Sequence, residues 1–121
     1  MILVDTAVWV DHLRTGDRTL EHLLDEGQVL VHGFIIGELA LGVLRQRVAT
    51  LEALHELPQA ETATDREVLQ FIERDRLFGL GIGYIDAHLL ASTRLTPDAQ
   101  LWTRDRRLLD AAKNLGLAAE L

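Results

Sequence analysis

The sequence predicts an α/β fold in which a central, mostly parallel sheet carries helices on both faces, a three-layer α/β/α arrangement. Short apolar runs alternate with longer segments of helical periodicity, in the order strand, helices, strand, helices, strand, helix. This alternation is typical of parallel sheets, because a crossover between parallel strands needs a connection as long as a helix. The 121 residues contain no repeat and have the length of one ordinary domain, so we expect a single domain over residues 1–121.

The first half of the chain predicts two strands and four helices. Ile2–Val4 is a continuous apolar run and predicts a buried strand, and the stretch QVLVHG at 28–33 predicts a second one. Apolar residues recur at helical spacing in four further segments, which we expect to be helices: 5–13, 17–26, 34–47 and 48–57.

The second half begins with a turn at Pro58, where a short strand can form. Thr64 and Glu67 have the spacing of a capping box, which predicts a helix that continues to about Arg76. A glycine-rich stretch precedes a helix that starts at 82 or 83 and is stopped by Pro97. The remaining segments predict a strand, a helix and an edge strand or tail, at 99–103, 105–114 and 117–121 respectively.

Composition limits the classes of function. The chain has 19 acidic and 12 basic residues, a formal net charge of −7, and no cysteine. An acidic total argues against a protein that binds nucleic acid by charge alone, although it is compatible with an enzyme that gathers carboxylates around a cation. We see neither a signal peptide nor an apolar run long enough to span a bilayer, so we expect a cytoplasmic protein without membrane association. Neither a P-loop nor a dinucleotide fingerprint is present.

Two acidic residues occupy apolar helix stripes. The helical neighbours of Glu38 at three and four residues are Phe34, Ile35, Leu41 and Gly42, and those of Asp86 are Ile82, Gly83, Leu89 and Leu90. A carboxylate among apolar side chains is costly unless it meets a cation. A buried arginine partner, a boundary position or a metal ion would each account for such a residue.

Two more acidic residues, Asp5 and Asp105, follow apolar runs at predicted strand-to-helix junctions. Aspartate is a common N-cap, so helix capping alone would explain either of them. Capping and metal binding are compatible, because a carboxylate has two oxygens.

Taken together, the four acids predict a metal site. The carboxyl ends of parallel strands share one edge of the sheet, where ligands of open α/β sheets bind. We therefore expect Asp5, Glu38, Asp86 and Asp105 to converge there, and their mutual repulsion to be relieved by a divalent cation. Oxygen ligands without cysteine favour Mg²⁺ or Mn²⁺ over Zn²⁺. Such a site suits hydrolysis of phosphodiester bonds.

The order of the motifs resembles a known family. ILVDTAVW at the start, IIGELALGV around Glu38, YIDAHLLASTRL around Asp86 and LWTRDRRLLDAA around Asp105 are similar, in sequence and order, to PIN domains, and more narrowly to VapC toxin ribonucleases. The resemblance covers essentially the whole chain. It implies a PIN-like fold and an endoribonuclease that requires Mg²⁺ or Mn²⁺, with the four acids as metal ligands and catalytic residues.

The resemblance also implies partners and supporting residues. Such toxins usually form homodimers and are inhibited by a cognate antitoxin, which places a basic side chain near the acids and a helix in an apolar groove. Thr6 and Thr103 would be hydroxyls that support the acids or position water. Some relatives carry a further acid after the fourth, but Arg106 and Arg107 follow here, so the number of metal ions, one or two, stays open.

For several residues, and for the function itself, the sequence allows more than one interpretation. Trp9 and Trp102 could stack on bases, but we favour packing in the core or an interface. His88 is expected to be structural, and Arg104 with its neighbours Arg106 and Arg107 could either bind RNA phosphate or form a solvated helix start. An RNA-binding module that blocks translation without cleavage is the main alternative function. A phospho-receiver domain is disfavoured, because it needs an acidic pair after the first strand and a late lysine.

Overall fold

The computed structural model describes residues 1–121, and its centre is a small parallel sheet. Strand β1 (Ile2–Val4) lies between β2 (Val29–Leu30) and β3 (Gln100–Trp102), giving the order β2-β1-β3. Leu3 of β1 is opposite Leu30 on one side and Leu101 on the other. All pairings are parallel, so the carboxyl ends of the strands lie at one edge, as predicted.

Single bridges extend the sheet on both sides. Val31 pairs with Gln59 in parallel, and Leu101 pairs with Ala118 in parallel. These bridges show that the short strand expected near Pro58 and the edge strand expected at 117–121 are present in minimal form. The extra pairing satisfies backbone groups that would otherwise be exposed along the edges of a three-stranded sheet.

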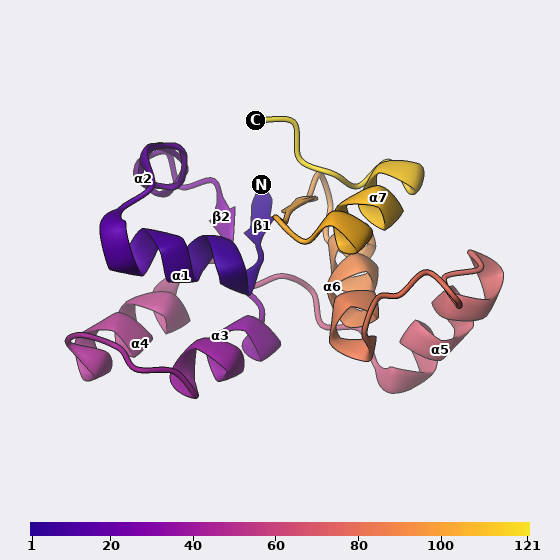
Figure 1. Ribbon diagram of the computed structural model, residues 1–121, viewed down its shortest axis with the longest axis horizontal. Coiled ribbons are helices and arrows are strands. Elements are labelled where there is room, and N and C mark those ends of the chain that lie inside the picture. The colour runs from indigo at the N-terminus through magenta and orange to yellow at the C-terminus, as the bar shows by residue number, and fades with distance from the viewer.

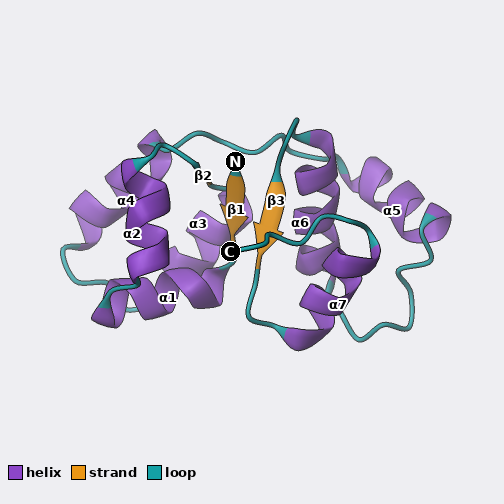
Figure 2. Ribbon diagram, turned by 90° about the horizontal axis from the view of Figure 1, so that it is seen from above, coloured by secondary structure: helices purple, strands orange, loops and turns teal.

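Helices cover both faces of the sheet, which confirms the predicted α/β/α layering. In Figures 1 and 2, α1–α4 lie on one side of the strands and α5–α7 on the other. The helices are α1 (Thr6–Thr15), α2 (Arg18–Asp25), α3 (Gly33–Ala40), α4 (Arg47–Glu56), α5 (Asp65–Arg74), α6 (Tyr84–Leu95) and α7 (Arg106–Asn114). The capping box predicted at Thr64 and Glu67 is formed, with both reciprocal hydrogen bonds.

One connected hydrophobic core joins the layers. It contains 27 buried residues, and Leu3 and Val4 at its centre have no exposed surface. Burial on both faces of β1 explains why its sequence is uniformly apolar instead of alternating. The strand is therefore held rigidly, and the residue that follows it has a fixed position.

The prediction of one helix over 34–47 was wrong at its end, because α3 stops at Ala40. Gly42 and the β-branched Val43 disfavour helix at this point. The Arg47 side chain donates hydrogen bonds to the carbonyls of Ala40 at 2.6 Å and Gly42 at 3.3 Å, which satisfies acceptors freed by the helix end. The break turns α4 away from α3 and leaves the connecting segment on the surface.

None of the seven helices combines the length and the apolar character that crossing a bilayer requires.

Candidate metal and catalytic site

Asp5 stands where β1 ends and α1 begins. Its backbone N–H donates to the Trp102 carbonyl at 2.9 Å, so the ends of β1 and β3 are joined directly. One side-chain oxygen, Oδ1, accepts from the backbone N–H of Thr6 at 2.8 Å and caps α1. The helix dipole favours negative charge at this position. Asp5 is therefore both a helix cap and a carboxylate at the sheet edge, which the sequence left as compatible roles.

Thr103 connects Asp5 with Asp105. Its buried hydroxyl donates to Asp5 Oδ2 at 2.7 Å and accepts from the backbone N–H of Asp105 at 3.1 Å. Asp105 in turn caps α7, with Oδ1 accepting from the backbone N–H of Leu108 at 3.0 Å. A single hydroxyl thus fixes the relative positions of two acidic residues that are 100 positions apart in the sequence.

Glu38 joins the same group through Thr6. The Thr6 hydroxyl donates to Glu38 Oε1 at 3.1 Å, which links the start of α1 to α3. Glu38 itself is exposed, so the expectation of a carboxylate within a buried apolar stripe was wrong for this residue. Its apolar neighbours Phe34 and Leu41 are also exposed, whereas the core contacts of α3 come from another face of the helix, formed by Ile35, Ile36 and Leu39.

Asp86 lies in the first turn of α6 and is half-buried. Its Oδ2 accepts from the backbone N–H of Gly83 at 3.0 Å, which favours the ionised form. The pKa of Asp86 is nevertheless raised, first by desolvation and then by the negative charges of Asp5 and Asp105. The repulsion shows that three of the four acids share one electrostatic environment, while Glu38 is not among the charges that raise this pKa.

The donor chemistry at this edge fits a hard divalent cation. Glu38, Asp86 and Asp105 each use one carboxylate oxygen to accept a hydrogen bond from the protein. The second oxygen of each accepts none; these free atoms are Oε2 of Glu38, Oδ1 of Asp86 and Oδ2 of Asp105. A cation would also relieve the repulsion at Asp86. With the side chains as they stand, however, no three acidic or histidine residues are arranged so that they hold one ion. Binding would therefore require the free oxygens to close in around the metal.

Three other residues considered as candidates, Trp9, His88 and Trp102, pack against other parts of the protein. Trp9 is buried in the core, as favoured. His88 is buried, and its Nε2 lies 3.0 Å from Asp65 Oδ1, so it is structural and takes no part in the acidic edge. Trp102 is half-buried beneath the guanidinium of Arg104, which stacks over its ring at 5.5 Å.

Arg104 makes contacts that sequence reasoning missed. Its guanidinium donates to Asp11 Oδ2 and, at 2.7 Å, to Asp17 Oδ2. The pKa of Arg104 is raised, chiefly by the hydrogen bond to Asp17, and the pKa of Asp17 is lowered, chiefly by its cap of the Leu20 backbone N–H and further by Arg104. These pairs fasten the segment between β3 and α7 to the α1–α2 connection. Nothing in the sequence marks contacts between positions so far apart.

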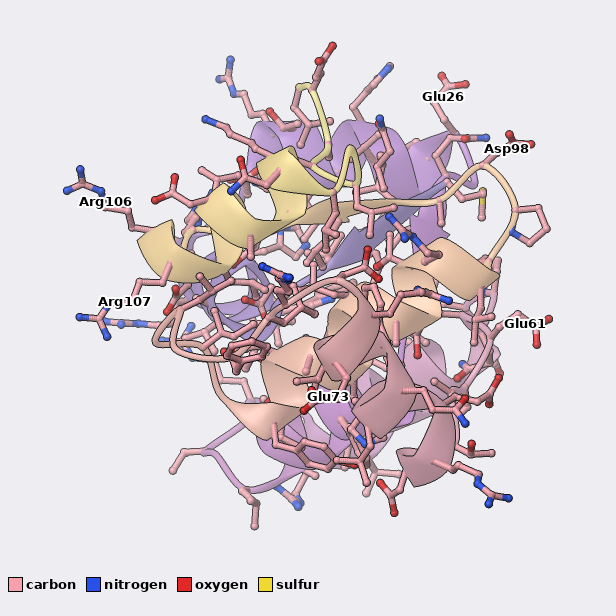
Figure 3. The ribbon with its side chains drawn as sticks, turned by 90° about the vertical axis from the view of Figure 1, so that its right-hand side faces the viewer. Glu26, Glu61, Glu73, Asp98, Arg106 and Arg107 are labelled. Carbon is pink, nitrogen blue, oxygen red and sulfur yellow. The ribbon has the colours of Figure 1, made fainter.

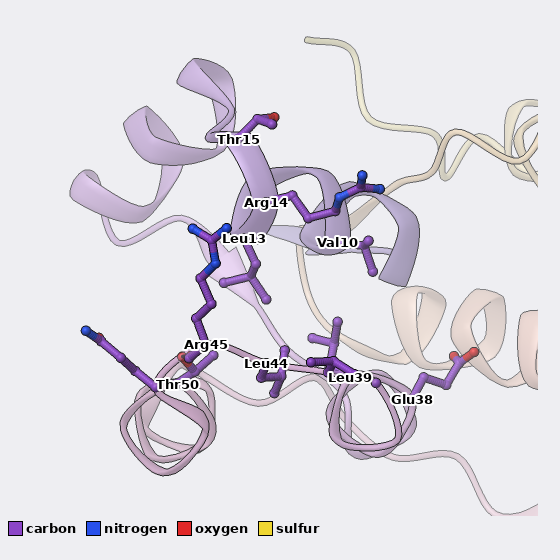
Figure 4. A pocket seen from close by; sticks show the side chains of 12 residues that line it. Val10, Leu13, Arg14, Thr15, Glu38, Leu39, Leu44, Arg45 and Thr50 are labelled. Carbon is purple, nitrogen blue, oxygen red and sulfur yellow. Dashed lines mark hydrogen bonds between the residues drawn. The ribbon is translucent and has the colours of Figure 1, made fainter.

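A groove adjoins the acidic edge. It has a volume of about 740 Å³ and runs between α1 and the α3–α4 connection. Figure 4 shows Val10 and Leu13 on one wall, Leu39 and Leu44 on the other, and Glu38 at one end. Glu38 therefore belongs both to the groove and to the acidic group.

Comparison with known proteins places the chain in a family. The model of the PIN domain family matches residues 2–114. Ribonuclease VapC32 of Mycobacterium tuberculosis, in strains CDC 1551 and H37Rv, is 47% identical over 118 residues, which cover 98% of this chain and 95% of the relative. The solved structure described as FitAB bound to an IR36 DNA fragment has a TM-score of 0.62 at 19% identity, covers 93% of this chain and 91% of that one, and supports the fold alone. The resemblance found in the sequence is thus confirmed, and the chain belongs to the PIN domain family and, within it, to the VapC proteins.

Proposed function

We propose that this protein is a metal-dependent endoribonuclease that acts as the toxin of a toxin–antitoxin pair. The observation that carries the proposal is the acidic group at the carboxyl edge of the sheet, in which Thr103 links Asp5 to Asp105 and Thr6 links its neighbour Asp5 to Glu38. Desolvation, and then the charges of Asp5 and Asp105, raise the pKa of Asp86 beside them. A repulsive cluster of carboxylates in a partly desolvated place is expected to bind a cation. The identity with a protein named as a ribonuclease supports RNA as the substrate. The connected core supports treating residues 1–121 as a single PIN domain.

In this proposal Asp5, Glu38, Asp86 and Asp105 hold Mg²⁺ or Mn²⁺. The ion would supply a Lewis acid that lowers the pKa of an attacking water and offsets charge on the phosphate. The protein supplies rigid placement: Asp5 and Asp105 are fixed as helix caps, and the Thr103 hydroxyl sets the distance between them. Thr6 orients Glu38 across from them. The cytoplasmic location stays a prediction.

We further propose that the cognate antitoxin inserts a basic, amphipathic segment into the groove between α1 and the α3–α4 connection. Leu41 and Val43 beside the groove are 90% and 104% exposed, which is unusual for aliphatic side chains in such a cluster. Glu38 at the end of the groove would attract a cationic side chain toward the acids. The net charge of −7 favours a basic partner.

A second copy of the chain is the other partner in this proposal. Phe34, Tyr84 and Ile85 are partly exposed apolar residues, and the rings of Phe34 and Tyr84 both pack edge-on against His88, at 4.9 and 4.7 Å. Phe34 and Tyr84 therefore belong to one surface across α3 and α6, and Ile85 follows Tyr84 in the first turn of α6. We propose that a homodimer covers this surface, next to the acidic edge.

The function is tested by cleavage of RNA. Purified protein should cut cellular RNA in Mg²⁺ or Mn²⁺ and lose this activity in EDTA. Asp5→Asn should lower the rate by at least about a hundredfold, because it removes a charged oxygen ligand while keeping the cap of α1. Asp110→Asn, which changes an exposed acid in the middle of α7, is the matched control and should cut normally. Cleavage that is equal in wild type and Asp5→Asn would contradict the proposal, and binding of RNA without any cleavage would favour the translation-blocking alternative.

A further inference from the structure

Three arginines flank Asp105 in the sequence, and their side chains make different contacts in the structure. Arg104 is occupied by its ion pairs with Asp11 and Asp17. Neither Arg106 nor Arg107 lies within ion-pair distance of any carboxylate, and both are exposed. Figure 3 shows the side chains of Arg106 and Arg107 projecting from the start of α7. The protein therefore leaves two cationic side chains unpaired beside an acidic edge.

Arg107 differs from Arg106 because it lies against the glycine-rich segment that leads into α6. A Cβ atom built on Gly81 would stand 2.6 Å from Arg107 Nη1 and 2.8 Å from its Cδ. A larger residue at this position would displace the Arg107 side chain from its present place, and Gly81 also has a φ of +77°, which other residues rarely adopt. The close contact restricts the rotamers of Arg107, so less side-chain entropy is lost when its guanidinium binds an anion.

The contact also links the start of α7, which follows Asp105, to the segment that leads to Asp86. Arg107 follows Asp105 by two residues, and Gly81 precedes Gly83, whose backbone N–H holds Asp86. The guanidinium thus lies against Gly81, two residues before Gly83, on a side chain that belongs to the helix capped by Asp105. An RNA chain must bring a phosphate to these acids although the protein has a net charge of −7, and a nearby unpaired cation is the group that offsets the repulsion.

We propose that Arg107 binds a phosphate of the RNA chain next to the one that is cleaved, and that Gly81 keeps the guanidinium in place for this contact. The inference rests on the proposed ribonuclease function and specifies how the substrate is held. Arginine suits the role because its planar fork donates two parallel hydrogen bonds to a phosphate. Arg104 is excluded from it by its ion pairs, and Arg106 lacks the supporting glycine.

The test separates binding from cleavage. The full chain with Asp86→Asn, which we expect not to cut, is titrated with a fluorescently labelled, single-stranded RNA of mixed sequence over a series of salt concentrations. Adding Arg107→Gln should weaken binding by about tenfold, as expected for loss of a charged hydrogen bond. It should also reduce the slope of log K against log salt by about 0.7, the value for one lost phosphate contact on a single strand. Arg107→Lys should retain the slope and recover part of the affinity.

Arg106→Gln in the same background is the matched control, because it removes the same charge one residue away. It should change affinity much less than Arg107→Gln does, and thermal melting should show that both variants are folded. Equal effects of the two substitutions, an unchanged salt slope in Arg107→Gln, or no RNA binding by the parent protein would each overturn the inference.

Cleavage by protein with intact acids is measured separately. Arg107→Gln should raise KM with little change in kcat, because the contact is made before the chemical step. If wild type does not cut RNA, the proposed function fails, while the comparison of Arg106 and Arg107 in binding still decides the role of Arg107. If wild type cuts and the two arginine variants bind alike, the function stands and this inference fails.

Discussion

At the scale of single residues, the acidic edge shows carboxylates with two tasks each. Asp5 and Asp105 cap helices with one oxygen, and Asp86 holds the Gly83 backbone N–H. The capping bonds keep the carboxylates in place in the absence of a cation, at the cost of mutual repulsion. Local structure thus provides the rigidity that a preorganised metal site needs.

The raised pKa of Asp86, caused first by desolvation and then by repulsion, predicts that a metal ion stabilises wild type and Asp86→Asn to different extents. Because the folded-state pKa of Asp86 is raised, its ionisation opposes folding, so Asp86→Asn should melt a few degrees above wild type in EDTA at neutral pH. Mn²⁺ should stabilise wild type more than Asp86→Asn and remove or reverse this difference. Differential scanning calorimetry of both proteins, with and without Mn²⁺, measures the effect.

The same shift fixes the pH dependence of that difference in EDTA. A raised pKa means that the carboxyl favours folding when protonated and that this contribution is lost as the pH rises through the folded-state value. The advantage of Asp86→Asn should therefore be full at neutral pH and disappear as the pH falls to about 4, the ordinary value for aspartate. A difference in melting temperature that is independent of pH would show that ionisation of Asp86 is not its cause.

At the scale of elements, the break between α3 and α4 has a consequence for partners. The helix ends before Val43 and Leu44, and the turn that follows places these two residues in the lining of the groove opposite α1. The Arg47 hydrogen bonds to Ala40 and Gly42 hold this turn. The groove is thus a product of where one helix ends.

Val43→Lys tests the groove as the antitoxin site. A charge on a fully exposed side chain should leave folding and ribonuclease activity unchanged but weaken binding of the antitoxin by about tenfold or more, because the ammonium group would have to be desolvated and would repel a basic partner. Val48→Lys is the matched control, since Val48 is also exposed, at 71%, but does not line the groove. Isothermal titration with the cognate antitoxin measures both. Equal weakening by the two variants would place the antitoxin elsewhere.

At the scale of the whole molecule, the uncovered apolar surface of Phe34, Tyr84 and Ile85 predicts a dimer. Ile85→Glu should convert the protein to a monomer in sedimentation velocity, because a charge would be buried in the interface. Leu95→Glu, at the other end of α6 and 44% exposed, should remain a dimer. A wild-type protein that is monomeric at high concentration would contradict the prediction.

The sequence by itself determined the elements and the identity of the acidic residues. Apolar runs and capping signals are local, so Ile2–Val4, the capping box at Thr64 and most helix bounds could be read from neighbouring residues. Asp5 and Asp105 were found because they follow strands, and parallel strands share an edge. The metal-ligand role of the four acids stays a proposal.

Only the tertiary structure decided how distant segments meet. It paired β1 with both β2 and β3, set Glu38 on an exposed face, joined Arg104 to Asp11 and Asp17, and brought Arg107 against Gly81. These features depend on which surfaces lie next to each other after folding. Side chains separated by 26 positions, as for Gly81 and Arg107, or by 93, as for Asp11 and Arg104, carry no local signal of their contact. The sequence supplied the reactive groups, and packing determined their surroundings.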